Sequence, residues 1–115
     1  MEFSLEGTTL HVSDVERSLQ FYGRIPGAVV QVHRPGVFAL LKIGKSRLGL
    51  LGVGASGQFH IEIGTTDLDS AYERVREAGI EPEGPPKDSW GDRSFLVKDP
   101  DGYWVEFDTA LEDGA

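Results

Sequence analysis

The sequence runs through the same order of elements twice, and this repeat limits the possible folds more than any other feature. Residues 8–13 and residues 58–63 alternate between apolar and polar side chains, which predicts a half-buried strand at the start of each half. A helical segment follows each of these strands. Three strand-like runs then complete each half, at residues 28–33, 37–43 and 47–53 in the first and at 80–83, 93–98 and 103–108 in the second. The pattern predicts two βαβββ modules, at residues 5–53 and 57–110.

Local signals place the two helices. The Ser13-x-x-Glu16 pattern has the form of a capping box, and Thr66 is a good N-cap residue for the second helix. Pro26-Gly27 ends the first helix and Gly79 stops the second. Each helix carries an apolar stripe at helical spacing, formed by Val15, Leu19 and Tyr22 in the first and by Leu68, Ala71, Tyr72, Val75 and Ala78 in the second. Each stripe is expected to cover one face of its sheet, so the other face stays free.

The size and charge of the chain exclude several functions. With 115 residues it is expected to form one domain, and residues 52–57, three of them glycine, form the predicted linker between modules. The net charge of −8 argues against a nucleic-acid partner, which needs a clustered basic surface. No apolar run is long enough for a membrane span, and no secretory signal is visible at the N-terminus. The absence of cysteine rules out thiolate chemistry. A cytoplasmic location fits these features.

Three side chains suggest a metal site. His11 and His60 occupy equivalent first strands, on the face opposite the large apolar residues, and Glu106 lies on the corresponding face of the last strand. Two imidazoles and one carboxylate suit iron, manganese, zinc, nickel or cobalt, and form the facial set of non-haem Fe(II) oxygenases. Spacing alone leaves open that all three are ordinary strand residues. His33, before Arg34-Pro35-Gly36, is expected to be a solvated turn residue.

The same residues carry a resemblance to the vicinal-oxygen-chelate superfamily, which includes glyoxalase I, extradiol dioxygenases and bleomycin-resistance proteins. The matching motifs are Leu10-His11-Val12-x-Asp14, His60-Ile61 with Asp67-Leu68-Asp69, and Gly91-x-Arg93-x-Phe95-x3-Asp99-Pro100-Asp101-Gly102-x3-Glu106-Phe107. The resemblance implies an α+β fold in which two βαβββ modules form an eight-stranded mixed sheet curled into an incomplete barrel. It also implies a homodimer, in which the modules of two chains can exchange.

The resemblance further implies one divalent metal ion, with Fe(II) favoured and Mn, Ni, Co or Zn possible. Its ligands would be His11, His60, Glu106 and a residue of the strand at 47–51. Gly49 stands where glyoxalase I has a carboxylate, and this strand offers no other ligand. A three-ligand site of the extradiol dioxygenase kind is therefore expected, although most such enzymes have four modules. An isomerase or lyase acting on a small molecule stays open.

A non-catalytic role is the alternative. Bleomycin-resistance proteins share the fold, are acidic, and sequester a cationic aromatic antibiotic in a groove between two chains. The charge of −8 suits that role, and aromatic side chains are available for stacking at Trp90, Trp104 and Phe38. Such proteins generally lack the metal residues that this chain retains. The metal-dependent enzyme is therefore favoured.

A few further residues are weaker candidates. Trp104 shares the face of Glu106 and is expected to wall the substrate pocket, to which Arg93 and Gly49 are also assigned. Arg93 is alternatively a structural partner of the turn at residues 99–102. Glu62, two residues after His60 on the same face, is a candidate fourth ligand or catalytic base.

Overall fold

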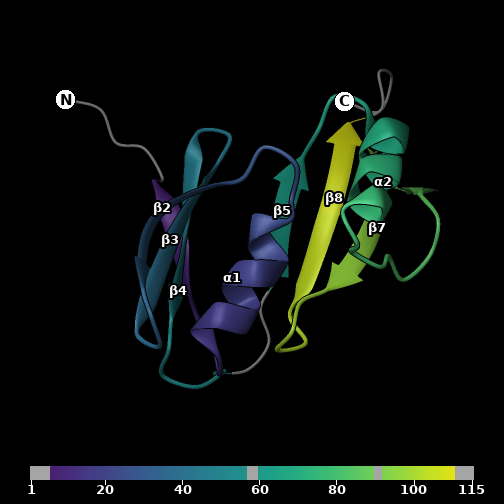
Figure 1. Ribbon diagram of the computed structural model, residues 1–115. Helices are drawn as coiled ribbons and strands as arrows, with labels where there is room; N and C mark the ends of the chain where they lie inside the picture. Colours follow the sequence, from purple (N-terminus) through teal and green to yellow (C-terminus); the bar gives the residue numbers. More distant parts are fainter. Residues whose placement is uncertain (1–5, 57–59, 90–91, 111–115) are drawn as a thin grey trace. The chain divides into compact units, whose positions relative to one another are not determined.

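The computed structural model describes residues 6–56, 60–89 and 92–110 (Figure 1). The chain divides into two compact units, Met1–Gly57 and Gln58–Ala115. Each unit contains one helix and a four-stranded mixed sheet, in the order strand, helix, three strands. The prediction of an α+β fold built from two βαβββ modules is therefore confirmed. In the described part of the chain, neither helix has the length and apolar character needed to cross a membrane.

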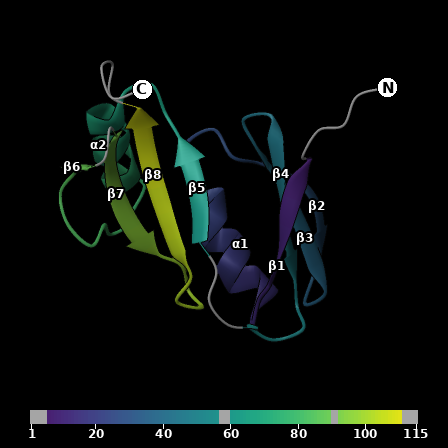
Figure 2. The ribbon, with the colours of Figure 1, turned by 180° about the vertical axis from the view of Figure 1, so that it is seen from behind.

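The first unit places its first strand beside its last. Its elements are β1 (Gly7–His11), α1 (Val15–Gly23), β2 (Val29–Arg34), β3 (Phe38–Ile43) and β4 (Ser46–Leu51). The strand order is β1-β4-β3-β2, with β1 parallel to β4 and the remaining pairs antiparallel (Figure 2). Leu10, Leu41 and Leu50 are buried in this unit, as are Val15 and Tyr22 of α1. These two helical residues belong to the apolar stripe predicted from the sequence.

The second unit repeats this topology. Its elements are β5 (His60–Gly64), α2 (Leu68–Glu77), β6 (Lys87–Ser89), β7 (Asp92–Lys98) and β8 (Trp104–Ala110), and the strand order is β5-β8-β7-β6. The helix α2 lies over β7 and β8 (Figure 1). Beneath it, the rings of Phe95 and Phe107 stack with centroids 4.9 Å apart, and Tyr72 of α2 meets Phe95 edge-on. This aromatic cluster buries one face of the sheet against the helix.

The N-cap of each helix lies one residue later than predicted. Asp14, in an extended conformation, accepts a hydrogen bond from the backbone N–H of Arg17 at 3.0 Å and caps α1. Asp67 caps α2 by accepting from the backbone N–H of Ser70 at 3.2 Å. The predictions of Ser13 and Thr66 were wrong, because the adjacent aspartates reach the third N–H of each helix.

The second strand of the second half also differs from the prediction. The strand expected at 80–83 is absent from the described residues, and the edge strand β6 lies at Lys87–Ser89 instead. Pro82, Pro85 and Pro86 follow Ile80 closely, and proline offers no N–H to a strand ladder. Only after the last of these prolines does regular pairing with β7 begin. Residues 58 and 59 of the predicted strand at 58–63 lie outside the described part of the chain.

His33 lies within β2 and not in a turn. Its Nε2 atom lies 2.9 Å from Oε2 of Glu16 on α1, and the same oxygen accepts from the backbone N–H of Gly36 at 2.8 Å. Gly36 has a φ of 74°, so the turn between β2 and β3 uses a conformation that glycine adopts without strain. Through these two contacts, Glu16 connects α1 to β2 and to the turn that follows it. The bond to His33, followed by the bond to Gly36, lowers the pKa of the Glu16 carboxyl below its ordinary value.

Removing the N-cap of α1 is expected to weaken the first unit. Asp14→Ala should lower the free energy of unfolding by about 1 kcal/mol, because the Arg17 N–H loses its side-chain acceptor. Asp14→Asn retains an acceptor and should cost less. Urea denaturation measures both, with Thr66→Ala as a matched control at the position that the sequence wrongly favours. An equal loss in Asp14→Ala and Thr66→Ala would contradict the assignment of the caps.

Glu16 is expected to give the fold an acid-sensitive contact. Because the folded-state pKa of Glu16 is lowered, its contribution to stability is present above its unfolded pKa and is lost as the pH falls through the folded value. Glu16→Gln should therefore lower the melting temperature near neutral pH, and the difference from the parent protein should shrink in acid. Melting curves from about pH 3 to about pH 7 measure this. A difference that does not change with pH would contradict the role of the carboxylate charge, and Glu81→Gln serves as the control.

Candidate metal site

The free face of the second sheet collects polar side chains from two parallel strands. Register pairs His60 with Trp104 and Glu62 with Glu106 across β5 and β8, and Gly64 with Asp108. The intervening residues Val105 and Phe107 are buried on the side of α2. Because side chains alternate along a strand, the polar set projects from the opposite face. This face is the one predicted to be free.

His60 and Glu106 are in direct contact. Nε2 of His60 lies 3.0 Å from Oε1 of Glu106, although the two residues are 46 positions apart in sequence. The His60 side chain is 54% exposed and that of Glu106 is 21% exposed. Two of the three predicted ligands are therefore adjacent, on one face of one unit, and both are accessible to solvent.

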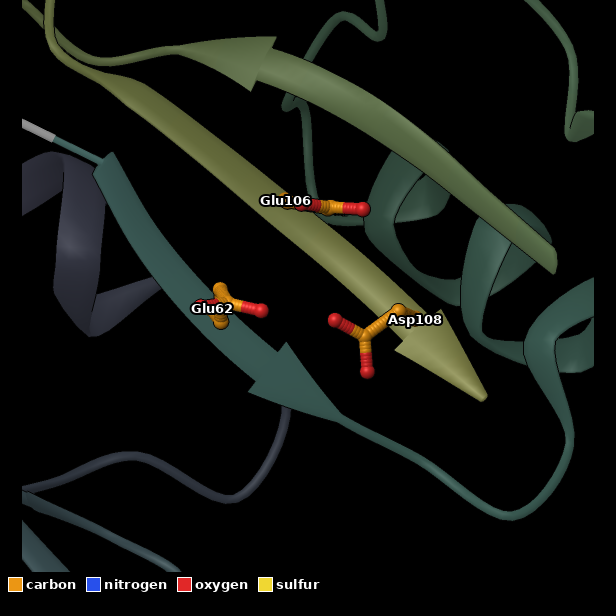
Figure 3. A group of neighbouring side chains, drawn as sticks. All are labelled: Glu62, Glu106 and Asp108. Atoms are coloured by element: carbon orange, nitrogen blue, oxygen red, sulfur yellow. The ribbon is translucent and has the colours of Figure 1, made fainter. Parts of the chain in front are cut away.

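Two further carboxylates lie beside this pair. Oxygen atoms of Glu62, Glu106 and Asp108 lie within 4.8 Å of one another, and Figure 3 shows Glu62 on β5 beside Glu106 and Asp108 on β8. Burial raises the pKa of the Asp108 carboxyl, and so do the negative charges of Glu106, Glu62 and Asp92. Three carboxylates at this separation repel one another, and a bound cation would relieve that repulsion.

The donor set fits a divalent metal ion. Around an ion bound at about 2.1 Å, neighbouring ligand atoms at right angles are about 3.0 Å apart, the separation found between His60 and Glu106. Without an ion, the same separation is that of a hydrogen bond between the two side chains. Imidazole nitrogen with carboxylate oxygen is the donor chemistry of iron, manganese, nickel, cobalt and zinc sites.

The remaining predicted ligand belongs to the first unit. His11 is exposed at the end of β1, where it pairs in register with Leu51 of β4. His60 and Glu106 belong to the second unit, so their meeting with His11 at one ion stays a prediction. The structure thus brings two of the three ligands together within a single unit, and adds Glu62 and Asp108 to them.

Gly49 occupies a position that neighbouring side chains fill. It pairs with Thr9 in β1, and a Cβ atom added to it would meet Oγ1 of Thr9 at 2.8 Å and Cε1 of Phe38 at 3.3 Å. A metal-binding carboxylate at residue 49 would have to displace both side chains. Residue 49 therefore lacks a metal-binding side chain, and the packing of Thr9 and Phe38 leaves little space for one.

Arg93 lies on the other side of the second sheet. Its guanidinium donates to Asp88 at 2.8 Å and to Asp69 at 3.0 Å, and these bonds raise the pKa of Arg93, with Asp69 the larger cause. The expected contact with the turn at 99–102 is wrong, because Arg93 stands at the far end of β7 from it. Asp99 itself holds that turn by accepting from the N–H groups of Asp101 and Tyr103. This placement gives no support to a contact between Arg93 and a ligand at Glu106.

Trp104 lies on the free face, as expected. It stands next to His60 in register, and Nζ of Lys98 in β7 lies 4.7 Å from the centroid of its ring. This distance is within the range of a cation–π interaction. Trp90 lies outside the described residues.

Sequence reasoning did not single out Asp108. The alternation that places Glu106 on the free face also places Asp108 there, two residues further along β8. That signal was available, but carboxylates on an exposed strand are common, and their convergence with Glu62 depends on the register between β5 and β8.

The packing around Gly49 can be tested by adding a single carbon. Gly49→Ala should lower the free energy of unfolding by about 1 kcal/mol, because Thr9 and Phe38 must move. Thr9→Ser keeps the hydroxyl that a Cβ atom at residue 49 would meet, whereas Thr9→Gly removes that hydroxyl. Combining Thr9→Gly with Gly49→Ala should therefore cost less than the sum of the single changes in a double-mutant cycle measured by urea denaturation. Strict additivity would contradict the predicted steric contact.

Comparisons with known proteins agree with this architecture. A model of the Glyoxalase/Bleomycin resistance protein/Dioxygenase superfamily matches residues 4–107. A solved structure described as a glyoxalase/bleomycin resistance protein/dioxygenase from Nocardioides is 28% identical, with a TM-score of 0.79 over 99% of this chain and 87% of that chain.

Two further solved structures share the fold at lower identity. Lactoylglutathione lyase from Agrobacterium tumefaciens is 23% identical, with a TM-score of 0.79 over 92% of both chains. TioX from Micromonospora sp. ML1 is 24% identical, with a TM-score of 0.76 over 95% of this chain and 100% of that chain. Proteins with different names thus share this architecture, so the fold alone does not select an activity.

Proposed function

The chain belongs to the glyoxalase/bleomycin resistance protein/dioxygenase superfamily, and we propose that it is a metal-dependent enzyme acting on a small molecule. His60 and Glu106 hold one divalent ion, with His11 as the third ligand. The observation that carries the proposal is the 3.0 Å approach of His60 Nε2 to Glu106 Oε1 on the free face of the second sheet. Iron(II) is the favoured ion, and manganese, nickel, cobalt or zinc also suit these donors.

The crowding of carboxylates supports the same proposal. Glu62 and Asp108 lie beside Glu106, and no lysine or arginine forms a salt bridge with these three carboxylates among the residues that the structure describes. The face therefore concentrates negative charge without a fixed counter-ion. Such a face attracts cations, and an imidazole within bonding distance favours a metal ion over a merely diffuse attraction.

The bound metal would act as a Lewis acid toward two oxygens of the substrate. The chain's own residues do the rest. Glu62 stands directly opposite Glu106 and can accept a proton from a carbon or hydroxyl next to those oxygens. Trp104 covers the side of the site toward Lys98 and gives a flat apolar wall. Gly49 supplies no ligand, so fewer positions around the ion are occupied by protein than in a four-ligand site.

These residues support two reaction classes. Proton transfer through Glu62 corresponds to an isomerase or a lyase, whereas a three-ligand site with Fe(II) corresponds to an extradiol-like dioxygenase. Activity of Glu62→Gln distinguishes them, because an isomerase or lyase depends on this carboxylate. Loading with Fe(II) without air, followed by O₂ and a panel of catechols, tests the dioxygenase class directly.

Metal content is the decisive measurement. Protein purified without a metal-binding tag and soaked in Fe(II), Mn(II), Ni(II) or Zn(II) should retain about one ion per chain after dialysis. His60→Ala and Glu106→Gln should each lose the ion, because each substitution removes one of its ligands. His33→Ala is the matched control, since His33 contacts Glu16 on α1 of the first unit. A parent protein that stays metal-free under all four conditions would overturn the proposal.

Ligand sequestration is the second candidate. The acidic free face and the net charge of −8 favour an organic cation as well as a metal ion. The position of Lys98 over Trp104 weakens this alternative, because an ammonium already lies where a cationic aromatic ligand would stack. Metal-free protein that binds the planar cation proflavine more tightly than a neutral analogue would favour sequestration.

A further inference from the structure

We propose that Lys98 selects substrates with a negatively charged group on the end away from the metal-binding oxygens. This inference rests on the proposed function, because it names the substrate class of the same site. It depends on the order of side chains across the free face of the second sheet. That order runs from a basic and aromatic row to an acidic row.

The first row crosses three strands. Lys98 of β7 pairs in register with Trp104 of β8, and Trp104 pairs with His60 of β5. Nζ of Lys98 lies 4.7 Å from the centre of the Trp104 ring. Trp104 therefore lies between Lys98 and His60 in the order of positions across the sheet. Because all three positions are adjacent in register, a small molecule can touch all three side chains.

The second row holds the carboxylates. Glu106 follows Trp104 by two residues on β8, and Glu62 lies opposite it on β5. Two residues of a strand span about 6.6 Å, so the two rows are about that far apart. A ligand that binds the metal at His60 and Glu106 thus has a few bonds of length before it reaches Lys98.

The ammonium of Lys98 is available to a ligand. In the described part of the chain, its interaction is with the Trp104 ring, and no carboxylate forms a salt bridge with it. Lys98 is exposed, and an ammonium has three N–H donors, which one aromatic ring does not satisfy. An anionic group would receive charge-assisted hydrogen bonds there.

Charge also fixes the direction in which such a ligand binds. A free carboxylate placed near Glu62, Glu106 and Asp108 is repelled, whereas one placed at Lys98 is attracted. The molecule therefore presents its chelating oxygens to the metal and its charged end to Lys98. A short 2-hydroxy or 2-oxo acid with a second carboxylate at the far end has these features.

The first test measures the anion contact without any metal. Trp90→Phe leaves Trp104 as the only tryptophan, so its fluorescence reports on the ring beneath Lys98. Titration of this metal-free protein with glutarate, at ionic strength held constant with NaCl, should give a saturable change. Lys98→Met should abolish the change, Lys98→Arg should retain it, and Lys45→Met in the turn between β3 and β4 should leave it intact. No saturable change in the parent, or an unaltered change in Lys98→Met, would overturn the proposal.

The second test uses metal-loaded protein and a matched pair of ligands. The dissociation constant for 2-hydroxyglutarate should be on the order of tenfold lower than that for 2-hydroxypentanoate, which has a methyl group in place of the distal carboxylate. Lys98→Met should remove this preference without changing the metal content. Equal binding of the two ligands by the parent protein would overturn the proposal.

The two proposals fail in different ways. A protein that takes up no metal but binds glutarate through Lys98 contradicts the enzyme and keeps the anion contact. A protein that takes up metal but does not distinguish the two hydroxy acids keeps the metal site and removes the role of Lys98.

Discussion

The parallel pairing of β5 with β8 is the constraint on which the candidate site depends. It joins the first and last strands of the second unit, and its register sets Glu62 opposite Glu106 and His60 opposite Trp104. A shift of β5 by one residue would turn His60 and Glu62 to the side of α2. The first unit uses the same arrangement between β1 and β4, where it sets Thr9 opposite Gly49. The same parallel pairing of first and last strands thus gathers possible metal ligands in the second unit. In the first unit it places the Thr9 side chain in the space beside Gly49.

The two faces of the second sheet have different physical tasks. The side of α2 contains the stacked rings of Phe95 and Phe107, and burial of that apolar surface stabilises the unit. The free face gains nothing comparable, because it places three carboxylates near one another and raises the pKa of Asp108. An arrangement that works against the charged state of its own side chains is typical of a site that meets a ligand. Stability and the proposed chemistry are therefore divided between the faces.

Family membership and local chemistry answer different questions about this chain. The superfamily match covers residues 4–107, which accounts for the fold but leaves the activity open. Within that fold, Gly49 removes one ligand position and the Thr9 side chain fills its space. The row of Lys98, Trp104 and His60 then gives the free face a positive end beside its negative one. These local features, and not the architecture, form the basis for proposing a particular substrate class.

The sequence alone determined the repeat, the fold class and the faces on which His60 and Glu106 lie, because alternation and helical spacing are local properties of the chain. It misplaced both helix caps by one residue, since neighbouring Ser, Thr and Asp are all good caps and only backbone geometry selects one. It also misplaced β6, where closely spaced prolines delay pairing. Only the tertiary structure decided that His60 touches Glu106, that Asp108 joins them, and that Arg93 is bound by Asp69 and Asp88. Those contacts depend on strand register and on long-range packing, which no local pattern encodes.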